Sequence, residues 1–359
     1  MQVKTRLLRQ LAGEEVDRIP LVGGWNLGLD IVCELAGISR EVYLADPLGG
    51  VIEANLKLGM DALALPIIPR DPAAIRAGKL EQHDFSSVEP EALLERAEKI
   101  PDSAAKVIAA FDPVLAEAEL RDRVEALLYR LRGRGLEFFP NFWDAGANFS
   151  LYFEYGYEAF LAAVALYPEA IERIYWENGL RTAERNKVLL KLMREWELIP
   201  AVFCGCDICD NRGPMVSPDY LRVNYWPHVR TSLAPLLEAG IRMVHHCDGN
   251  VMALLDDMLA SGFTGFQGFQ TECGVDPAEI RRRTLKYHPD PLLLGGLSVT
   301  RALPSGSADE VRAEVDSIFD VTDGGRGLFL FTSNCTGVET PVENIRTAYR
   351  YAAGKKVGK

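Results

Sequence analysis

Residues 218–249 read PDYLRVNYWPHVRTSLAPLLEAGIRMVHHCDG, and this stretch decides the fold. Its first part, Pro218–Ala239, has the length and apolar spacing of an amphipathic helix, with proline in the first turn. Gly240 then stands where a glycine caps the C-terminus of a helix. The next residues, Ile241–His246, form a short apolar run that predicts a buried strand. The stretch is therefore one helix followed by one strand, and polar residues follow the strand.

Similar units recur along the chain, because short apolar runs alternate with longer amphipathic segments. The strand-like runs are Arg18–Gly23, Asp61–Ile68, Lys106–Phe111, Glu137–Trp143, Ile199–Cys204, Ile241–His246, Phe263–Phe269, Leu292–Leu297 and Leu328–Thr332. The helix-like segments include Glu91–Lys99, Pro113–Leu131, Glu158–Arg194, Pro218–Ala239, Val251–Ser261, Pro277–Leu285, Ala308–Val321 and Val342–Ala352. The segment Glu158–Arg194 is long enough to hold two helices. Repeated strand–helix units predict parallel strands joined by right-handed crossovers.

About eight or nine such units fit a closed barrel better than an open sheet. An open dinucleotide-binding sheet would also show a glycine-rich turn after its first strand, and Gly23-Gly24-Trp25 is not that fingerprint. Irregular helical sequence from Leu29 to Leu58 is interpreted as an insertion near the barrel mouth. We therefore predict an α/β fold, a (β/α)8 TIM barrel with helical insertions near the N-terminus, in which residues 1–359 form a single domain.

Composition limits the function classes. The 359 residues carry a formal net charge of −12, which argues against nucleic-acid binding through phosphate contacts. No apolar run approaches the length of about 18 residues that a membrane span needs. Seven cysteines, and an opening segment without an apolar signal region, favour a reducing cytoplasm over a disulfide framework. We expect a cytoplasmic protein that binds neither nucleic acid nor membrane.

Catalytic groups in such a barrel stand just after the C-terminal ends of the strands. Four predicted strands run into polar segments: Trp143-Asp144, Gly205-Cys206-Asp207-Ile208-Cys209, Cys247-Asp248-Gly249-Asn250 and Ser333-Asn334-Cys335. Asp207 lies in a loop loosened by glycines, so we expect it to face the pocket rather than the core. Most of the aromatic residues near Trp25 and Trp143 are expected to pack in the core, and a subset could form an apolar cleft for a flat ligand.

The segment His245–Gly249 holds two of the five histidines of the chain, next to each other. Imidazole, thiolate and carboxylate are the usual zinc ligands, and Cys335 from a distant strand could supply a third ligand. The alternative is that one histidine packs in the core and Cys247 is a small buried hydrophobic residue. Adjacent histidines followed by Cys-Asp-Gly at a strand end favour the functional interpretation. Cys204-x-Cys206-x-x-Cys209, by contrast, is interpreted as three buried thiols.

Five short motifs, in sequence order, resemble the uroporphyrinogen decarboxylase superfamily. They are Val16-Asp17-Arg18-Ile19-Pro20, Gly59-Met60-Asp61-Ala62, Asp207 followed by Ser217-Pro218, Gly240 with His246-Cys247-Asp248-Gly249, and Pro341-Val342-Glu343-Asn344-Ile345. The resemblance covers nearly the whole chain and implies a (β/α)8 barrel. True uroporphyrinogen decarboxylases carry an arginine-rich N-terminal segment that binds the substrate carboxylates. Residues 23–30 here contain no arginine, which disfavours decarboxylation of a porphyrinogen.

The other large branch of this superfamily comprises corrinoid-linked methyltransferases, including methylcobamide:coenzyme M methyltransferases and O-demethylase components. The coenzyme M enzymes bind zinc through a His-x-Cys pair and a later cysteine, which Cys335 resembles. When the chain is aligned with this motif from Gly240 and Gly249, His246 matches the histidine, and Asp248 takes the place of the first cysteine. His245 and Cys247 have the same spacing but lie on the opposite face of the strand. The register favours His246, Asp248 and Cys335 as metal ligands, while the choice between Cys247 and Asp248 stays open.

A His/Asp/Cys ligand set would make zinc a harder Lewis acid, suited to an oxygen-bearing substrate. The resemblance thus implies a corrinoid-dependent methyltransferase of O-demethylase type that moves a methyl group from a small methoxylated, aromatic substrate to a corrinoid protein. Asp207, as a general acid, and His246 are the expected catalytic residues. Substrate contacts are expected from Trp25, Trp143, Asp144, His245 and Asn334. The corrinoid is expected on a separate protein, because the sequence contains no Asp-x-His-x-x-Gly cobalamin motif.

Three alternatives stay open. The first is methyl transfer from a methyl-corrinoid to a thiol such as coenzyme M. The second is a metal-free decarboxylation of a porphyrinogen or a related acid. A purely structural or binding role is the third, and the clustering of reactive groups at one barrel face makes it the least supported.

Overall fold

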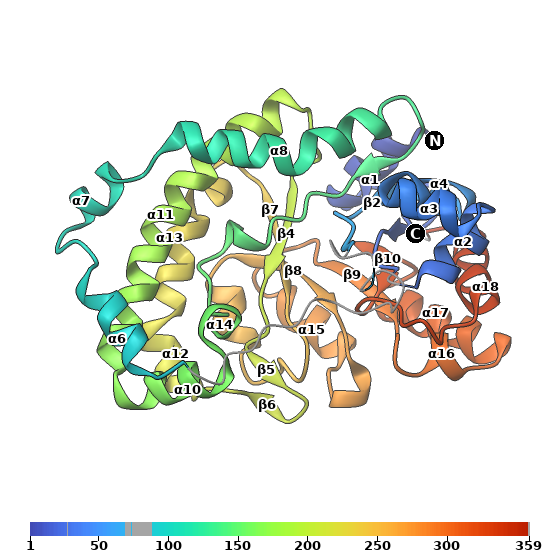
Figure 1. Ribbon diagram of the computed structural model, residues 1–359. Coiled ribbons are helices and arrows are strands. Elements are labelled where there is room, and N and C mark those ends of the chain that lie inside the picture. The colour runs from blue at the N-terminus through green and yellow to red at the C-terminus, as the bar shows by residue number, and fades with distance from the viewer. Residues whose placement is uncertain (27, 69–72, 74–87, 358–359) are drawn as a thin grey trace.

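The computed structural model describes residues 1–26, 28–68, 73 and 88–357 (Figure 1). Eight parallel strands run through the described residues: β1 (Val22–Gly23), β2 (Ala62–Leu63), β3 (Glu137–Phe138), β4 (Ala201–Gly205), β7 (Arg242–His246), β8 (Phe263–Gly268), β9 (Leu292–Leu297) and β10 (Leu328–Thr332). Strands β1, β2 and β3 form one sheet, and β4, β7, β8, β9 and β10 form a second, each in chain order. Single bridges, Asn141 with Phe203 and Leu21 with Leu330, join the two sheets at both edges. The predicted α/β barrel architecture is thereby confirmed.

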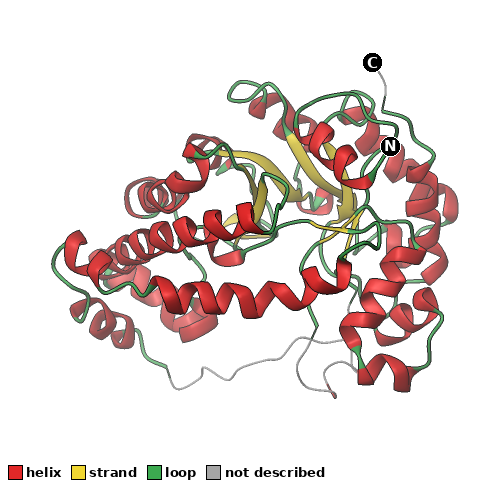
Figure 2. Ribbon diagram, turned by 90° about the horizontal axis from the view of Figure 1, so that it is seen from above, coloured by secondary structure: helices red, strands yellow, loops and turns green. Residues whose placement is uncertain are grey.

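Helices lie around the strands in the view from above (Figure 2). They are α1 (Val3–Leu11), α2 (Leu29–Ala36), α3 (Arg40–Ala45), α4 (Pro47–Lys57), α6 (Glu91–Glu98), α7 (Ala104–Ala109), α8 (Pro113–Leu131), α9 (Tyr152–Tyr155), α10 (Tyr157–Leu166), α11 (Pro168–Glu195), α12 (Pro218–Asn224), α13 (Trp226–Glu238), α14 (Leu255–Ala260), α15 (Pro277–Thr284), α16 (Ala302–Ser305), α17 (Ala308–Val321) and α18 (Val342–Ala353). The predicted helical insertion is present as α2 to α4. None of these described helices has the length and apolar character of a membrane span.

Of two predictions about the secondary structure of single segments, one is confirmed and the other is wrong. The stretch Glu158–Arg194 does contain two helices, α10 and α11, and Pro168 begins the second of them. The run Lys106–Phe111, predicted as a strand, lies largely in helix α7, so that prediction is wrong. Val107 is the buried side chain of α7. A short apolar run does not distinguish a strand from one helical turn that buries a single side chain, and its alanines favour the helix.

Side chains alternate between the barrel interior and the helix layer, as strand geometry requires. The interior core includes Val244 of β7 and Phe203 of β4, together with Leu7 and Leu11 of α1. Met243 of β7 belongs instead to the core between the strands and the helices. His246 follows Val244 by two residues and therefore shares its interior side. The strand pattern thus turns the second histidine, and not the first, toward the barrel axis.

Candidate active site

The loops after β4 and β7 bring two carboxylates beside His246. Gly205 at the end of β4 pairs with His246 at the end of β7, so the residues that follow these strands lie side by side. Asp207 and Asp248 each come two residues after this pair. The backbone N–H of Asp248 donates to Asp207 Oδ1 at 2.9 Å, which fixes the two loops to each other.

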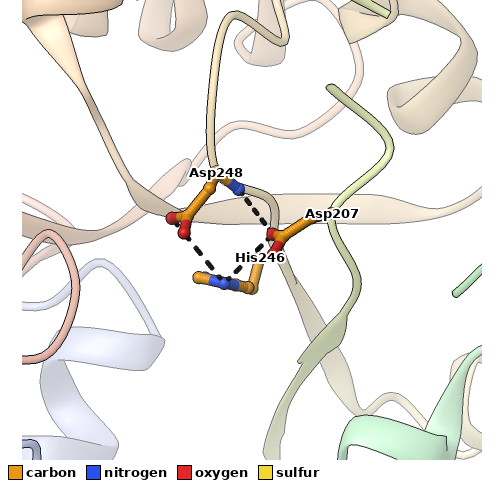
Figure 3. Close-up of side chains that lie close together, drawn as sticks. All are labelled: Asp207, His246 and Asp248. Carbon is orange, nitrogen blue, oxygen red and sulfur yellow. Dashed lines mark hydrogen bonds and ion pairs between the residues drawn. The ribbon is translucent and has the colours of Figure 1, made fainter. Parts of the chain in front are cut away.

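Asp207, His246 and Asp248 direct their polar atoms toward one point (Figure 3). His246 Nε2 lies 3.6 Å from Asp207 Oδ1 and 3.9 Å from Asp248 Oδ1. One ligand atom from each residue lies within 4.8 Å of the others. These three residues are called the carboxylate–imidazole cluster below.

The orientation of the His246 ring is determined by Gln267 of β8. Gln267 Nε2 faces the backbone carbonyls of Thr332 and Ser333 at 3.0 and 3.2 Å, and carbonyls only accept. The amide oxygen of Gln267 must therefore be the atom that contacts His246 Nδ1. That contact places the ring proton on Nδ1 and leaves the lone pair of Nε2 directed at the two carboxylates.

Asp248 has one satisfied and one free carboxylate oxygen. Asn334 donates through Nδ2 to Asp248 Oδ2, and its own Oδ1 accepts from the backbone N–H of Cys335 at 2.6 Å. Asp248 Oδ1 is buried and has no hydrogen-bond partner among the described residues. Burial raises the pKa of Asp248 to about 6, and the neighbouring Asp207 carboxylate adds to the rise, while His246 and Asn334 oppose it.

The cluster fits a metal ion by two criteria. Ligand atoms that bind zinc at about 2.0–2.2 Å lie about 3.4 Å from one another in a tetrahedral site. The ligand atoms of the cluster are close to this spacing, so small side-chain movements would bring them to it. A buried carboxylate oxygen without a partner, such as Asp248 Oδ1, is also costly unless a cation or donor completes it. Two carboxylates and one imidazole form a hard, oxygen-rich donor set.

A cavity of about 590 Å³ opens beside the cluster, and its lining includes all three cluster residues. Trp25 and Trp143 stack on each other with ring centroids 5.7 Å apart, and both present their rings to His246 at 5.8 and 5.1 Å. The remaining lining residues described are Ile67, Asp144, Asn148, Ser150, Phe153, Asn178, Gly205, Cys206, Asn334 and Cys335. The cavity thus joins two indole rings to a carboxylate–imidazole group.

Four of the predicted substrate-contact residues, Trp25, Trp143, Asp144 and Asn334, line this cavity. The fifth, His245, lies outside it: its ring packs edge-on against Phe263 at 4.6 Å. Burial lowers the pKa of His245 to about 3, so the ring is a neutral core group.

Asp144 also lines the cavity, and its charge is already matched by two arginines. Arg123 Nη1 lies 2.9 Å from Asp144 Oδ1, and Arg185 Nη2 lies 3.0 Å from Asp144 Oδ2. Although burial raises the pKa of Asp144, these guanidinium groups outweigh it and hold the pKa below its usual range.

Cys335 and Cys247, the two cysteines considered as metal ligands, have different positions. Cys335 lines the cavity but is not among the three residues whose ligand atoms converge, and Asp207 supplies the third atom in its place. Burial, with the nearby Asp248 charge, raises the pKa of the Cys335 thiol to about 12. Cys247 Sγ is buried, accepts from the backbone N–H of Ile208 at 3.3 Å and donates to Asp248 O at 3.0 Å. It therefore supports the two loops.

Sequence reasoning missed three residues that shape the site: Gln267, Asn148 and Asn178. Gln267 is the fifth residue of a predicted strand, two positions after Gly265, and the alternation rule could have placed it on an interior face. Asn178 lies within the long helix α11, where no sequence signal distinguishes it from a surface residue.

Comparisons with known proteins agree with this architecture. Residues 204–353, from the end of β4 through α18, match the family model described as uroporphyrinogen decarboxylase (URO-D). This match confirms the resemblance over that part of the chain. A solved structure described as a methyltransferase from Methanosarcina mazei superposes with a TM-score of 0.50 and 17% identity, covering 98% of each chain. At that identity, the likeness shows the fold alone. A search among curated proteins finds no match to this sequence.

Proposed function

We propose that this chain, with a uroporphyrinogen decarboxylase-type domain in its C-terminal part, is a methyltransferase of O-demethylase type. Its substrate is a small methoxylated arene, and its methyl acceptor is a corrinoid carried by a separate protein. The observation that carries the proposal is the carboxylate–imidazole cluster beside a cavity with two stacked indole rings. Indole rings bind a flat aromatic ring, and the cluster lies where an ether oxygen of that ring could reach it.

The chain's residues would divide the chemistry between them. Asp207, His246 and Asp248 would hold zinc, and when bound the ion supplies Lewis acidity toward the ether oxygen. In the reaction the oxygen–methyl bond breaks, its electron pair stays on oxygen, and the methyl group passes to the acceptor. The phenolate that forms needs positive charge or a proton, and without an ion a protonated Asp207 would deliver that proton. Gln267 keeps the His246 ring in the orientation that the cluster requires.

The residues of this site argue against two alternatives, methyl transfer to a thiol and decarboxylation of a porphyrinogen. The three converging ligand atoms include no sulfur, whereas a site that activates a thiol is rich in thiolate ligands. The cavity lining, as far as the described residues go, contains no arginine or lysine. A porphyrinogen with several carboxylates would therefore find no counter-charge there.

The proposal is tested by incubating the purified protein with zinc, a reduced corrinoid protein and a panel of methoxy-arenes. We expect the demethylated phenol to form, measured by liquid chromatography. The variant His246→Ala should lose this activity, and His228→Gln, a histidine change on α13 that does not line the cavity, should keep it. Failure to demethylate any methoxy-arene would refute the proposal. Strict dependence on an added thiol would indicate the thiol methyltransferase instead, and release of carbon dioxide would indicate a decarboxylase.

A further inference from the structure

Two asparagines of the cavity have side-chain amides whose orientation is set by the backbone. The N–H of Asn148 donates to Asn178 Oδ1 at 2.7 Å, and the N–H of Ser150 donates to Asn148 Oδ1 at 2.8 Å. Because a backbone N–H can only donate, both contacted side-chain atoms must be oxygens. Both Nδ2 groups are then left without a hydrogen-bond partner among the described residues. Asn148 and Asn178 are called the amide pair below.

The amide pair and the carboxylate–imidazole cluster line the same cavity but come from different elements. Asn178 comes from α11, and Asn148 comes from the segment between Trp143–Ala145 and α9, whereas the cluster follows β4 and β7. Ser150, whose side chain is buried, lines the cavity beside them. A ligand whose reacting group contacts the cluster therefore meets hydrogen-bond donors with another part.

Charge narrows the ligand class further. The amide donors are uncharged, and Asp144, the carboxylate among the described lining residues that lies outside the cluster, is already paired with Arg123 and Arg185. No lysine or arginine is found among the described lining residues, so a carboxylate substituent would gain no ion pair. An ammonium substituent would place its N–H groups against the amide N–H groups. The residues around the amide pair therefore fit an uncharged oxygen atom that accepts hydrogen bonds.

We propose that the amide pair binds an uncharged oxygen substituent of the substrate ring, such as a carbonyl, a hydroxyl or a second methoxy group. This substituent lies away from the methoxy group that reacts. The amide pair therefore selects among methoxy-arenes and orients the ring between Trp25, Trp143 and the cluster. The inference rests on the proposed function for the methoxylated ring itself.

The experiment measures binding alone, by isothermal titration calorimetry without any corrinoid protein. The probes are anisole, 4-methoxyacetophenone and 4-methoxybenzylamine. A neutral hydrogen bond changes affinity by about threefold to tenfold, so the ketone should bind more tightly than anisole by about that factor. In Asn178→Asp the oxygen that accepts from Asn148 remains, but the free donor becomes an acceptor. This variant should lose the preference for the ketone over anisole and gain affinity for the amine.

Asn211→Asp makes the same chemical change in the turn between β5 (Cys209–Asp210) and β6 (Gly213–Pro214), outside the cavity lining, and should bind all three probes like the unmodified protein. Three outcomes would overturn the inference: no binding of any probe, equal affinity for anisole and the ketone, or an unchanged preference in Asn178→Asp. If the ketone binds through Asn178 but no methyl group is ever transferred, the proposed function fails and the amide-pair site stands.

Discussion

At the residue scale, the side of the strand decides which of the two adjacent histidines lines the cavity. His246 shares the interior side of β7 with Val244, while His245 packs against Phe263 outside the barrel. Alternation along a strand is a local property, so it could be predicted without knowing any distant contact. Gln267, the partner of His246 Nδ1, could not be predicted in this way. It belongs to another strand and contacts the His246 ring only after the two strands have paired.

The residues that hold the metal ion can be tested one at a time. We expect His246→Ala, Asp207→Asn and Asp248→Asn to lose bound zinc, because each removes one of the three converging ligand atoms. Cys335→Ala should retain it, because the thiol is outside the group of converging ligand atoms. Elemental analysis of the purified variants checks this. Loss of the metal in Cys335→Ala, or full retention in the other three, would show that the ligand set is wrong.

At the element scale, the loops after β4 and β7 are held in contact by backbone groups. The N–H of Asn250 donates to Asp210 O at 2.9 Å, and Gly249, the residue before Asn250, has a φ of 76°. A Cβ on Gly249 would lie 2.3 Å from Asp210 O, so only glycine fits this contact. The contact keeps the β5–β6 hairpin against the loop that carries Asp248.

Two glycines with the same backbone angle test this contact. Gly249 and Gly240 both have a φ of 76°, but nothing lies within 4 Å of a Cβ built on Gly240. Gly240→Ala should cost about 1 kcal/mol of unfolding free energy, the strain of a positive φ alone. Gly249→Ala should cost at least about 1 kcal/mol more, since the hairpin must move. Urea denaturation measures both, and equal losses would show that the close approach is relieved without cost.

Helix α17 carries a titrating carboxyl that faces β9. Glu314 Oε2 accepts from the backbone N–H of Ser298 at 3.0 Å. Burial raises the pKa of Glu314 to about 7, and the Glu272 carboxylate adds to the rise, against the Ser298 N–H and Arg301. The folded protein therefore favours the protonated acid more than the unfolded chain does, where the pKa is about 4.3.

This shift predicts how a substitution depends on pH. The stabilising contribution of protonated Glu314 is present below about pH 4.3 and is lost as the pH rises through about 7. Glu314→Gln keeps an acceptor for Ser298 and cannot ionise. Its melting temperature, relative to the unmodified protein, should therefore be higher at pH 8 than at pH 5. A difference that is the same at both pH values would contradict the assigned burial.

At the scale of the whole molecule, an ion network ties α1 to the first two strands. Asp61 is fully buried, with Arg6 Nη1 at 2.6 Å and Arg18 Nη1 at 2.7 Å. The backbone N–H of Leu21 also donates to Asp61 Oδ2, at 2.9 Å. Two of the motifs that carry the family resemblance, residues 16–20 and 59–62, thus meet in a structural network rather than in the cavity.

Breaking this network should destabilise the whole barrel. Asp61→Asn leaves two guanidinium groups without their shared buried carboxylate, which we expect to cost about 3–5 kcal/mol of unfolding free energy. Asp30→Asn removes a carboxylate from a pair with Arg40 in which both side chains are about two-thirds exposed (68% and 66%), and it should change stability little. Guanidinium denaturation compares the two variants, and similar losses would contradict the role given to Asp61.

The sequence by itself determined the alternation of strands and helices, the strand ends at which polar groups collect, and the fact that His246 and Asp248 share one side of β7. These follow from local periodicity, which one segment carries without its neighbours. The preference for that side over the side of His245 and Cys247 came from the family resemblance. Local pattern was insufficient at Lys106–Phe111, because a short apolar run fits a strand as well as a helical turn that buries Val107 alone.

Only the tertiary structure decided that Asp207, and not Cys335, completes the carboxylate–imidazole cluster, and that Asn148 and Asn178 leave two donors free in the cavity. The physical reason is that these placements depend on how loops from separate strands pack against one another. A backbone hydrogen bond from Asp248 to Asp207 fixes one distance, and the N–H of Asn148, in the segment before α9, fixes the orientation of the Asn178 amide on α11. Such contacts exist only after the strands have paired and the barrel has formed.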